Sequence, residues 1–365
     1  MSEMPRTMRA WRLHGHGGME MLSLDEVPVP APGPGEVLYR VAAAGLNNTD
    51  VNTRLGWYAK GVRGGTEEGA TADGQAGGWD GALDFPRIQG ADGCGRIVAV
   101  GEGGDASRIG QRIVVRTMQA LGPRRVAASK GAPLGPTDTW TYGSECDGAF
   151  AEYAIAFEEE AIPAPEGWSD VEAASLPCAW STAEGMIQRA GLGEGRVLVT
   201  GASGGVGSAA VQLLKRRGAE VVAMVGGDKA DAVRALGADA TLDRDEPLGS
   251  EAFDAVVDLV AGPRFADMLE AIRRGGRYVT SGAIAGPIVE LDVRTLYLRD
   301  LTLYGSTFQP PSILPDVVRY AEAGEVRPSV SATWPFEALK EAQAAFIRKR
   351  HVGKIVLEVG ERSAG

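Results

Sequence analysis

The sequence predicts an α/β protein in which a β-rich segment precedes a doubly wound parallel sheet. Residues 1 to 160 carry several strand-like runs, such as Glu36–Ala43, where side chains alternate at the two-residue period of a strand. From Ser169 onward, helical and strand-like segments alternate. Arg196–Val225 joins an apolar run, a glycine turn, a helix-spaced apolar stripe and a second apolar run. That order is typical of a parallel strand–helix–strand unit.

The second half is predicted to contain six parallel strands, of which Ala240–Leu242 is the weakest. After Phe308 the alternation is lost, and the tail reads as two helices and a final strand, Lys354–Val359. We expect this tail to rejoin the first domain. A chain of 365 residues favours two domains. The predicted boundaries are 1–165 and 309–365 for the first domain and 166–308 for the second.

The glycine turn between the first strand and helix of this unit is suited to binding phosphate. A helix N-terminus offers unpaired N–H groups and a partial positive charge, and glycines let a pyrophosphate approach the backbone. Three positions match the dinucleotide fingerprint, with alanine replacing the first glycine. The alternative is a tight structural turn in an ordinary α/β domain. The expected phosphate-binding residues are Ala202, Ser203, Gly204, Gly205, Val206 and Gly207.

Composition excludes several classes of function. The formal net charge of −11 argues against nucleic acid or an anionic membrane as the main partner. No apolar run is long enough for a membrane span, and the N-terminal residues lack the apolar core of a signal peptide. Three cysteines make a disulfide framework unexpected. The sequence therefore predicts a cytoplasmic protein.

Two long segments, 58–84 and 120–146, are rich in glycine and lack a clear period. We interpret 58–84 as a surface loop, with a lid over a site as the alternative.

Five stretches of the chain resemble the medium-chain dehydrogenase/reductase superfamily, and within it the zinc-independent quinone oxidoreductases. The resemblance covers nearly the whole length. It implies a GroES-like β-barrel domain, an inserted Rossmann domain and a C-terminal return to the barrel. The stretches are VLYRVAAAGLNNTD (37–50), FPRIQGADGCGRIVAVGEG (85–103), AASLPCAWSTAEGMI (173–187), VLVTGASGGVGSAAVQLLKRRGAEVVA (197–223) and GRYVTSG (276–282).

The resemblance also implies that no metal is bound. Zinc-dependent relatives use cysteine, histidine and a further cysteine or acid as ligands. The matching positions here hold Asn47 for the first cysteine and Ala91 for the histidine, and only Cys178 retains a ligand. The three histidines, His14, His16 and His351, are expected at the surface.

The cofactor predicted on this basis is NADPH. NAD-binding domains place an acid at the end of the second strand, where this chain has Val225 followed by Gly226. Asp228 lies close to this strand end in the sequence, and a carboxylate there would repel a 2′-phosphate, which argues against NADPH. By resemblance, Lys229 and Arg244 occupy 2′-phosphate-binding positions. The alternative is that both are solvated surface residues.

The resemblance places Asn47, Asp50, Thr182 and Gly282 near the nicotinamide. Asn47 is expected to donate a hydrogen bond to a substrate oxygen, and Asp50 to orient it or relay a proton through water. For Asn47 and Asp50 the alternatives are an Asx turn and a capping acid. For Thr182 the alternative is a buried structural hydroxyl, and Gly282 is expected to hold the carboxamide. No conventional general acid is evident, which leaves solvent as a source of the final proton.

The function predicted is NADPH-dependent, metal-free reduction of quinones or activated C=C bonds. The alternatives are an enoyl-thioester reductase, a zinc-type alcohol dehydrogenase and a non-catalytic NADPH-binding protein. The expected partner is a small-molecule substrate. Relatives are often dimers through the last Rossmann strand, here Leu301–Gly305, so a homodimer is also expected.

Overall fold

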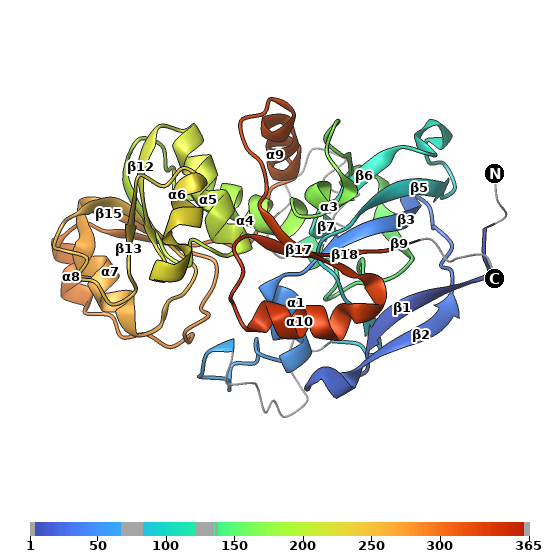
Figure 1. The fold of residues 1–365 in the computed structure, drawn as a ribbon, viewed down its shortest axis with the longest axis horizontal. Helices are drawn as coiled ribbons and strands as arrows, with labels where there is room; N and C mark the ends of the chain where they lie inside the picture. Colours follow the sequence, from blue (N-terminus) through green and yellow to red (C-terminus); the bar gives the residue numbers. More distant parts are fainter. Residues whose placement is uncertain (1–3, 67–82, 121–134, 136–137, 361–365) are drawn as a thin grey trace.

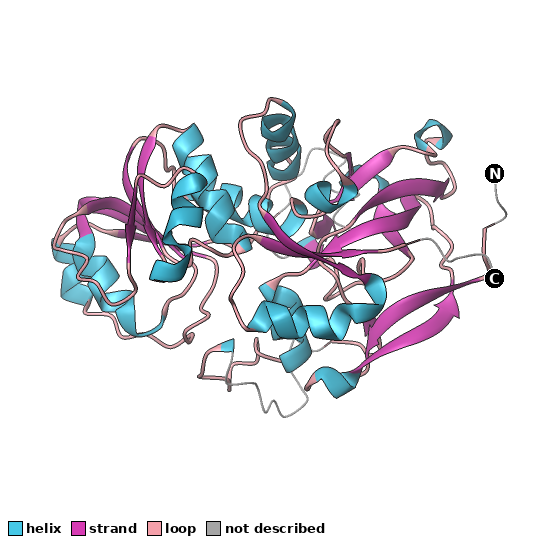
Figure 2. Ribbon diagram, in the orientation of Figure 1, coloured by secondary structure: helices cyan, strands magenta, loops and turns pink. Residues whose placement is uncertain are grey.

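The structure is a computed structural model that describes residues 4–66, 83–120, 135 and 138–360. Two sheets lie at opposite ends of the molecule, with helices between and around them (Figure 2). The predicted lid lies largely outside the described residues, as does most of the second glycine-rich segment.

The first sheet combines strands from the two ends of the chain. Its order is β10-β6-β5-β3-β18-β17, and β9 also pairs with β3. The C-terminal strand β18 runs antiparallel to β3, with Val356 opposite Gly45 (Figure 1). The chain therefore returns to its first sheet, as the sequence predicts. The strands are β3 Glu36–Gly45, β5 Cys94–Val100, β6 Arg112–Val115, β9 Tyr153–Phe157, β10 Ala161–Pro163, β17 Val330–Pro335 and β18 Lys354–Glu358.

Two smaller sheets complete this half of the molecule. A three-stranded sheet has the order β2-β1-β4, and β7 pairs with β8. Alternating burial along β1 indicates that one face lies on the core. The strands are β1 Thr7–Leu13, β2 Leu22–Pro28, β4 Arg87–Ile88, β7 Met118–Ala120 and β8 Thr139–Thr141. A short helix, α1 Asn48–Leu55, follows β3 directly.

The second sheet has six parallel strands in the order β13-β12-β11-β14-β15-β16. This order confirms the predicted doubly wound fold, in which the chain reverses direction beside β11. The strands are β11 Gly195–Val199, β12 Ala219–Met224, β13 Ala240–Leu242, β14 Phe253–Asp258, β15 Ile272–Thr280 and β16 Thr302–Gly305. The helices are α5 Gly205–Arg216, α6 Ala230–Ala235, α7 Phe265–Ala271 and α8 Val293–Leu298.

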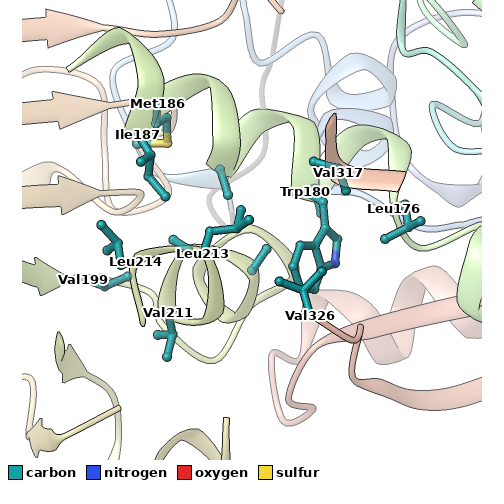
Figure 3. Packing of buried hydrophobic residues seen from close by; sticks show 14 of the residues in the cluster. Leu176, Trp180, Met186, Ile187, Val199, Val211, Leu213, Leu214, Val317 and Val326 are labelled. Atoms are coloured by element: carbon teal, nitrogen blue, oxygen red, sulfur yellow. The ribbon is translucent and has the colours of Figure 1, made fainter. Parts of the chain in front are cut away.

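The core of the second domain forms where α4 Pro177–Arg189 packs on α5 (Figure 3). Trp180 and Met186 of α4 are buried, as are Leu213 and Leu214 of α5. These leucines belong to the apolar stripe that the helical spacing predicts. Helix α9 Ile313–Glu322, which follows the second sheet, adds Val317 to the same cluster, whereas the last helix, α10 Leu339–Ile347, packs on the first sheet.

One predicted helix is broken. The helical pattern over 170–190 forms α3 Asp170–Ala173 and then α4, which begins at Pro177. Proline lacks a backbone N–H and suits the first turn of a helix, so a new helix starts there. The domain boundaries near residues 165 and 308 stay predictions. In the described part of the chain, every helix is too short or too polar to span a bilayer.

Candidate active site

The candidate site lies where the carboxyl ends of β11, β14 and β15 meet the C-terminal segment of the first sheet. The Gly353 N–H donates to the Ser203 carbonyl at 2.8 Å, and Gly353 also forms an isolated bridge with Gly204. The segment that precedes β18 therefore lies directly on the glycine turn. Ligands of doubly wound sheets bind at this edge.

The glycine turn is closely packed. A Cβ at Gly207 would lie 2.2 Å from the Gly201 carbonyl oxygen and 2.6 Å from the Ala202 Cα, so only glycine fits without a backbone shift. Gly204 is the N-cap of α5, and no side chain caps this helix. Its first N–H groups are thus available to an anion. These residues fit the dinucleotide-binding role predicted for 202–207.

Asp258, at the end of β14, stabilises the same edge of the sheet. It is fully buried and accepts hydrogen bonds from the hydroxyls of Thr200 and Tyr278, each at 2.5 Å. It also accepts from the Ala261 N–H at 3.0 Å. Sequence reasoning missed this residue, because an acid at a strand end carries no distinctive spacing.

A charged pocket of about 580 Å³ lies beyond the end of β12. Val225 is buried there, and no carboxylate occupies its position or that of Gly226. Four cationic and three acidic side chains line the pocket. They are Lys229, Arg244, Lys349, Arg350, Asp228, Asp243 and Asp245.

Both predicted phosphate-binding residues are in this pocket. The Lys229 ammonium donates to the Lys349 carbonyl, and burial lowers the pKa of Lys229 while the Asp228 charge opposes the shift. An Arg244 guanidinium nitrogen lies 3.9 Å from the position of a Cβ on Gly226.

Sequence reasoning missed two of the cations, Lys349 and Arg350, because they lie more than 100 residues away on the returning tail. The one feature of the sequence that could have indicated them is the run of three basic residues at 348–350.

Asn47 lies in a buried polar cluster rather than facing an open space. Its Nδ2 donates to Asp92 Oδ2 at 2.8 Å and to the Gly45 carbonyl at 3.3 Å. Its Oδ1 accepts from the Lys354 ammonium at 2.6 Å. Both amide hydrogens are therefore engaged within the protein. Donation from Asn47 to a substrate oxygen stays a prediction, and it would require one of these bonds to open.

Asp50 caps the start of α1, which was the alternative interpretation of its role. One carboxylate oxygen accepts from the Asn47 N–H at 2.8 Å and the other from the Ala91 N–H at 3.3 Å. Burial, with a smaller contribution from the Asp92 charge, raises the pKa of Asp50 to about 7. A carboxyl with a raised pKa can serve as a cap and as a proton relay, and the relay role of Asp50 stays a prediction.

Thr182 lies on α4 and is half-buried. Its hydroxyl accepts a hydrogen bond from Gln309 Nε2 at 3.2 Å, and the Gln309 carbonyl accepts from the buried Arg116 at 2.7 Å. Gln309 Oε1 is buried and has no hydrogen-bond partner among the described residues. An incoming N–H donor could satisfy that oxygen. Sequence reasoning missed Gln309 because it follows the last recognisable strand.

Gly282 follows β15 at the same edge of the sheet. Its carbonyl accepts from the Thr280 hydroxyl at 3.0 Å. A Cβ at Gly282 would lie 3.0 Å from the Leu259 carbonyl oxygen, so the two strand ends approach closely.

The three histidines differ in exposure. His14 is exposed, and His16 and His351 are both partly exposed, with His351 packed on Phe346 at a ring-centroid distance of 5.2 Å. Burial and the nearby Lys349 charge lower the pKa of His351 to about 4.

Two protein families match the chain, and together they span most of it. The alcohol dehydrogenase GroES-like domain matches residues 33–166, and the zinc-binding dehydrogenase family matches residues 205–323. A provisionally assigned alcohol dehydrogenase from Sinorhizobium meliloti 1021 is 41% identical, with a TM-score of 0.86, and 98% of each chain is covered. The chain belongs to the medium-chain dehydrogenase/reductase superfamily.

Two further superfamily members are more distant but are also similar over nearly the whole chain. An acryloyl-coenzyme A reductase from Sulfurisphaera tokodaii is 28% identical over 94% of this chain and 98% of its own. The Streptomyces 2-octenoyl-CoA carboxylase reductase CinF was solved in complex with NADP and 2-octenoyl-CoA. It is 26% identical, with a TM-score of 0.84, over 100% of this chain and 90% of its own. The predicted superfamily and the predicted GroES-like and Rossmann folds are thus confirmed.

A catalytic zinc, which the second family name implies, does not fit the residues present. Ala91 offers no ligand atom, and Asn47 offers only an amide oxygen already bonded to Lys354. Within the described ranges, no three His, Cys, Asp or Glu side chains are grouped closely enough to hold a metal ion. Catalytic zinc sites need three such protein ligands.

Proposed function

We propose that this protein is an NADPH-dependent oxidoreductase that reduces activated C=C bonds without a metal. The observation that carries the cofactor assignment is the charged pocket beyond β12. Four cations line it, and the acid that would repel a 2′-phosphate is missing from the strand end. CinF, a superfamily member of the same fold, was solved with NADP.

The residues of the site would hold the dinucleotide in three places. The N–H groups at the start of α5 would receive the pyrophosphate. Lys229 and Arg244, with Lys349 from the returning tail, would receive the 2′-phosphate through charge-assisted hydrogen bonds. Gln309 Oε1, beside Thr182, would accept from the nicotinamide carboxamide.

The bound cofactor supplies a hydride, and the protein supplies position and charge stabilisation. A conjugated acceptor suits a site without a Lewis acid, because the negative charge delocalises over the carbonyl or thioester. Simple alcohol oxidation would leave the alkoxide charge on the substrate without a metal ion to stabilise it. Asp50, buried and with a pKa near 7, would pass a proton between the site and solvent. Asn47 would orient it, because the Asn47 N–H holds one carboxylate oxygen.

Enoyl thioesters are the first acceptor class to test within this proposal. Two relatives with near-complete coverage are named for acryloyl-CoA and 2-octenoyl-CoA chemistry. Quinones and simple enones remain in the proposal, since they place charge on the same kind of conjugated oxygen.

We also propose a homodimer formed through the open edge of the second sheet. β16 is its last strand, and the adjoining segment 288–298 exposes several large apolar side chains. Val293, Tyr297 and Leu298 of α8 are each about 60% exposed. Such a patch beside an open strand edge favours pairing with a second copy. The three cysteines are free, which is consistent with a reducing compartment such as the cytoplasm.

The proposal is tested by following NADPH absorbance with a panel of enoyl-CoA thioesters, enals, quinones and simple alcohols. Turnover of a conjugated acceptor that survives dialysis against a chelator supports it. Tight NADPH binding without turnover of any acceptor would instead indicate a non-catalytic binding protein. Alcohol oxidation that is lost with the chelator and restored by zinc would contradict the proposal.

A further inference from the structure

The ammonium group of Lys354 lies inside the buried polar cluster that contains Asn47 and Asp92, and all three of its hydrogens are donated there. Its side chain is 2% exposed. The ammonium donates to the Leu46 carbonyl at 2.8 Å, to Asn47 Oδ1 at 2.6 Å and to Asp92 Oδ2 at 2.7 Å. An ammonium has three hydrogens, so this lysine has none left for a substrate.

Asp92 receives donors from three different parts of the chain. Its Oδ2 accepts from Lys354 and from Asn47 Nδ2, while its Oδ1 accepts from the Cys178 N–H at 2.6 Å. The carboxylate is fully buried. Cys178 lies in the first turn of α4, and its thiol interacts electrostatically with Asp92 and Lys354. Three oxygen atoms, Asp92 Oδ2, Asn47 Oδ1 and the Leu46 carbonyl, thus converge on the Lys354 ammonium, and the half-buried Cys178 lies nearby.

We propose that the Lys354 ammonium takes the place of a metal ion in this cluster and excludes divalent cations from it. Lys354 neutralises Asp92 and occupies the position toward which Asp92 Oδ2, Asn47 Oδ1 and the Leu46 carbonyl point. The inference rests on the metal-free part of the proposed function. Its test measures metal binding rather than turnover, so the inference can fail while the proposed function holds, and the reverse.

The oxygen atoms around the Lys354 ammonium suit an ammonium better than a transition metal. They are one carboxylate oxygen and two neutral oxygens, which match the single charge of an ammonium, whereas transition metals such as zinc favour thiolate and imidazole.

Gly205 makes room for the lysine stem. A Cβ at Gly205 would lie 2.8 Å from Lys354 Cδ, so this glycine of the phosphate-binding turn also lets the lysine reach the cluster. Lys354 itself is a positioning residue. It fixes the orientation of the Asn47 side-chain amide, whose Nδ2 donates to Asp92, next to the backbone N–H that Asp50 accepts.

The test is a titration with Co²⁺, whose thiolate charge-transfer absorption reports ligation by cysteine. Three proteins are compared: the wild type, Asn47→Cys, and Asn47→Cys combined with Lys354→Met. The second retains the lysine beside two thiols and a carboxylate. The third removes the lysine and keeps the same donors. A matched control adds Asp92→Asn to the third, and circular dichroism checks the fold of each.

We expect no charge-transfer band from the wild type. Asn47→Cys with Lys354→Met should bind Co²⁺ at least about a hundredfold more tightly than Asn47→Cys alone. The Asp92→Asn control should lose most of that gain. Equal Co²⁺ affinity with and without Lys354, or tight binding by Asn47→Cys alone, would overturn the inference. Tight Co²⁺ binding by Asn47→Cys alone would overturn the inference even where the Lys354→Met protein unfolds, because Asn47→Cys keeps the Asp92–Lys354 pair.

Discussion

The Asp92–Lys354 ion pair allows a quantitative prediction about stability. The two charged groups are 2.7 Å apart, with side-chain exposures of 0% and 2%. Removing one partner of such a pair leaves a buried charge without compensation, which costs about 3–5 kcal/mol. We therefore expect Lys354→Met to lower the free energy of unfolding by about that amount. Replacing both partners removes the stranded charge and should recover part of the loss.

The measurement is a double-mutant cycle of Lys354→Met, Asp92→Asn and the combined variant. Urea unfolding followed by circular dichroism gives the free energies. Direct contact and complete burial predict a coupling energy of about 2–3 kcal/mol. Because Asp92 also accepts from the Cys178 N–H, Asp92→Asn should itself be destabilising. A coupling energy below about 0.5 kcal/mol would refute the reasoning, since it would mean that the pair interacts no more strongly than an exposed one.

Three further predictions concern the glycine turn, Asp50 and the subunit interface. Gly207→Ala should weaken NADPH binding at least about tenfold in calorimetry, because the Gly201 carbonyl must move, whereas Gly193→Ala, with open space around it, should not. Between pH 4 and 7 folded Asp50 holds a proton that the unfolded chain has lost. The free energy of unfolding should therefore fall as the pH rises through this range, by up to about 1.4 kcal/mol per pH unit. Asp50→Asn should lack that slope, and an unchanged slope would contradict the assignment. Leu298→Asp should produce a monomer in sedimentation experiments at concentrations where the wild type is a dimer, and a monomeric wild type would refute the proposed interface.

The sequence was most informative where local chemistry decides structure. The strand, glycine turn and helix at 197–216 could be predicted because glycine geometry and apolar spacing act within a few residues. The return of the C-terminal strand to the first sheet also followed, from the loss of the alternating pattern after residue 308 and from the family resemblance.

The missed parts of the site depend on contacts between distant segments. Lys354 reaches Asp92 across 262 positions, and Gln309 reaches Thr182 across 127. No local period marks such pairs. Asn47 was expected to donate to a substrate because its segment resembles one that faces the nicotinamide. That role stays a prediction, and the sequence could not show that Lys354 binds the Asn47 amide oxygen.

The most direct test of the central claim is calorimetric binding of NADPH and NADH to the wild type and to Lys229→Ala combined with Lys349→Ala. Charge-assisted hydrogen bonds to a phosphate contribute about 1.5–3 kcal/mol each. The account predicts that the wild type binds NADPH at least about tenfold more tightly than NADH, and that the double variant loses most of this preference while its NADH affinity changes little, with Arg244 responsible for what is left. Equal wild-type affinities, or a preference for NADPH that both substitutions leave undiminished, would contradict it.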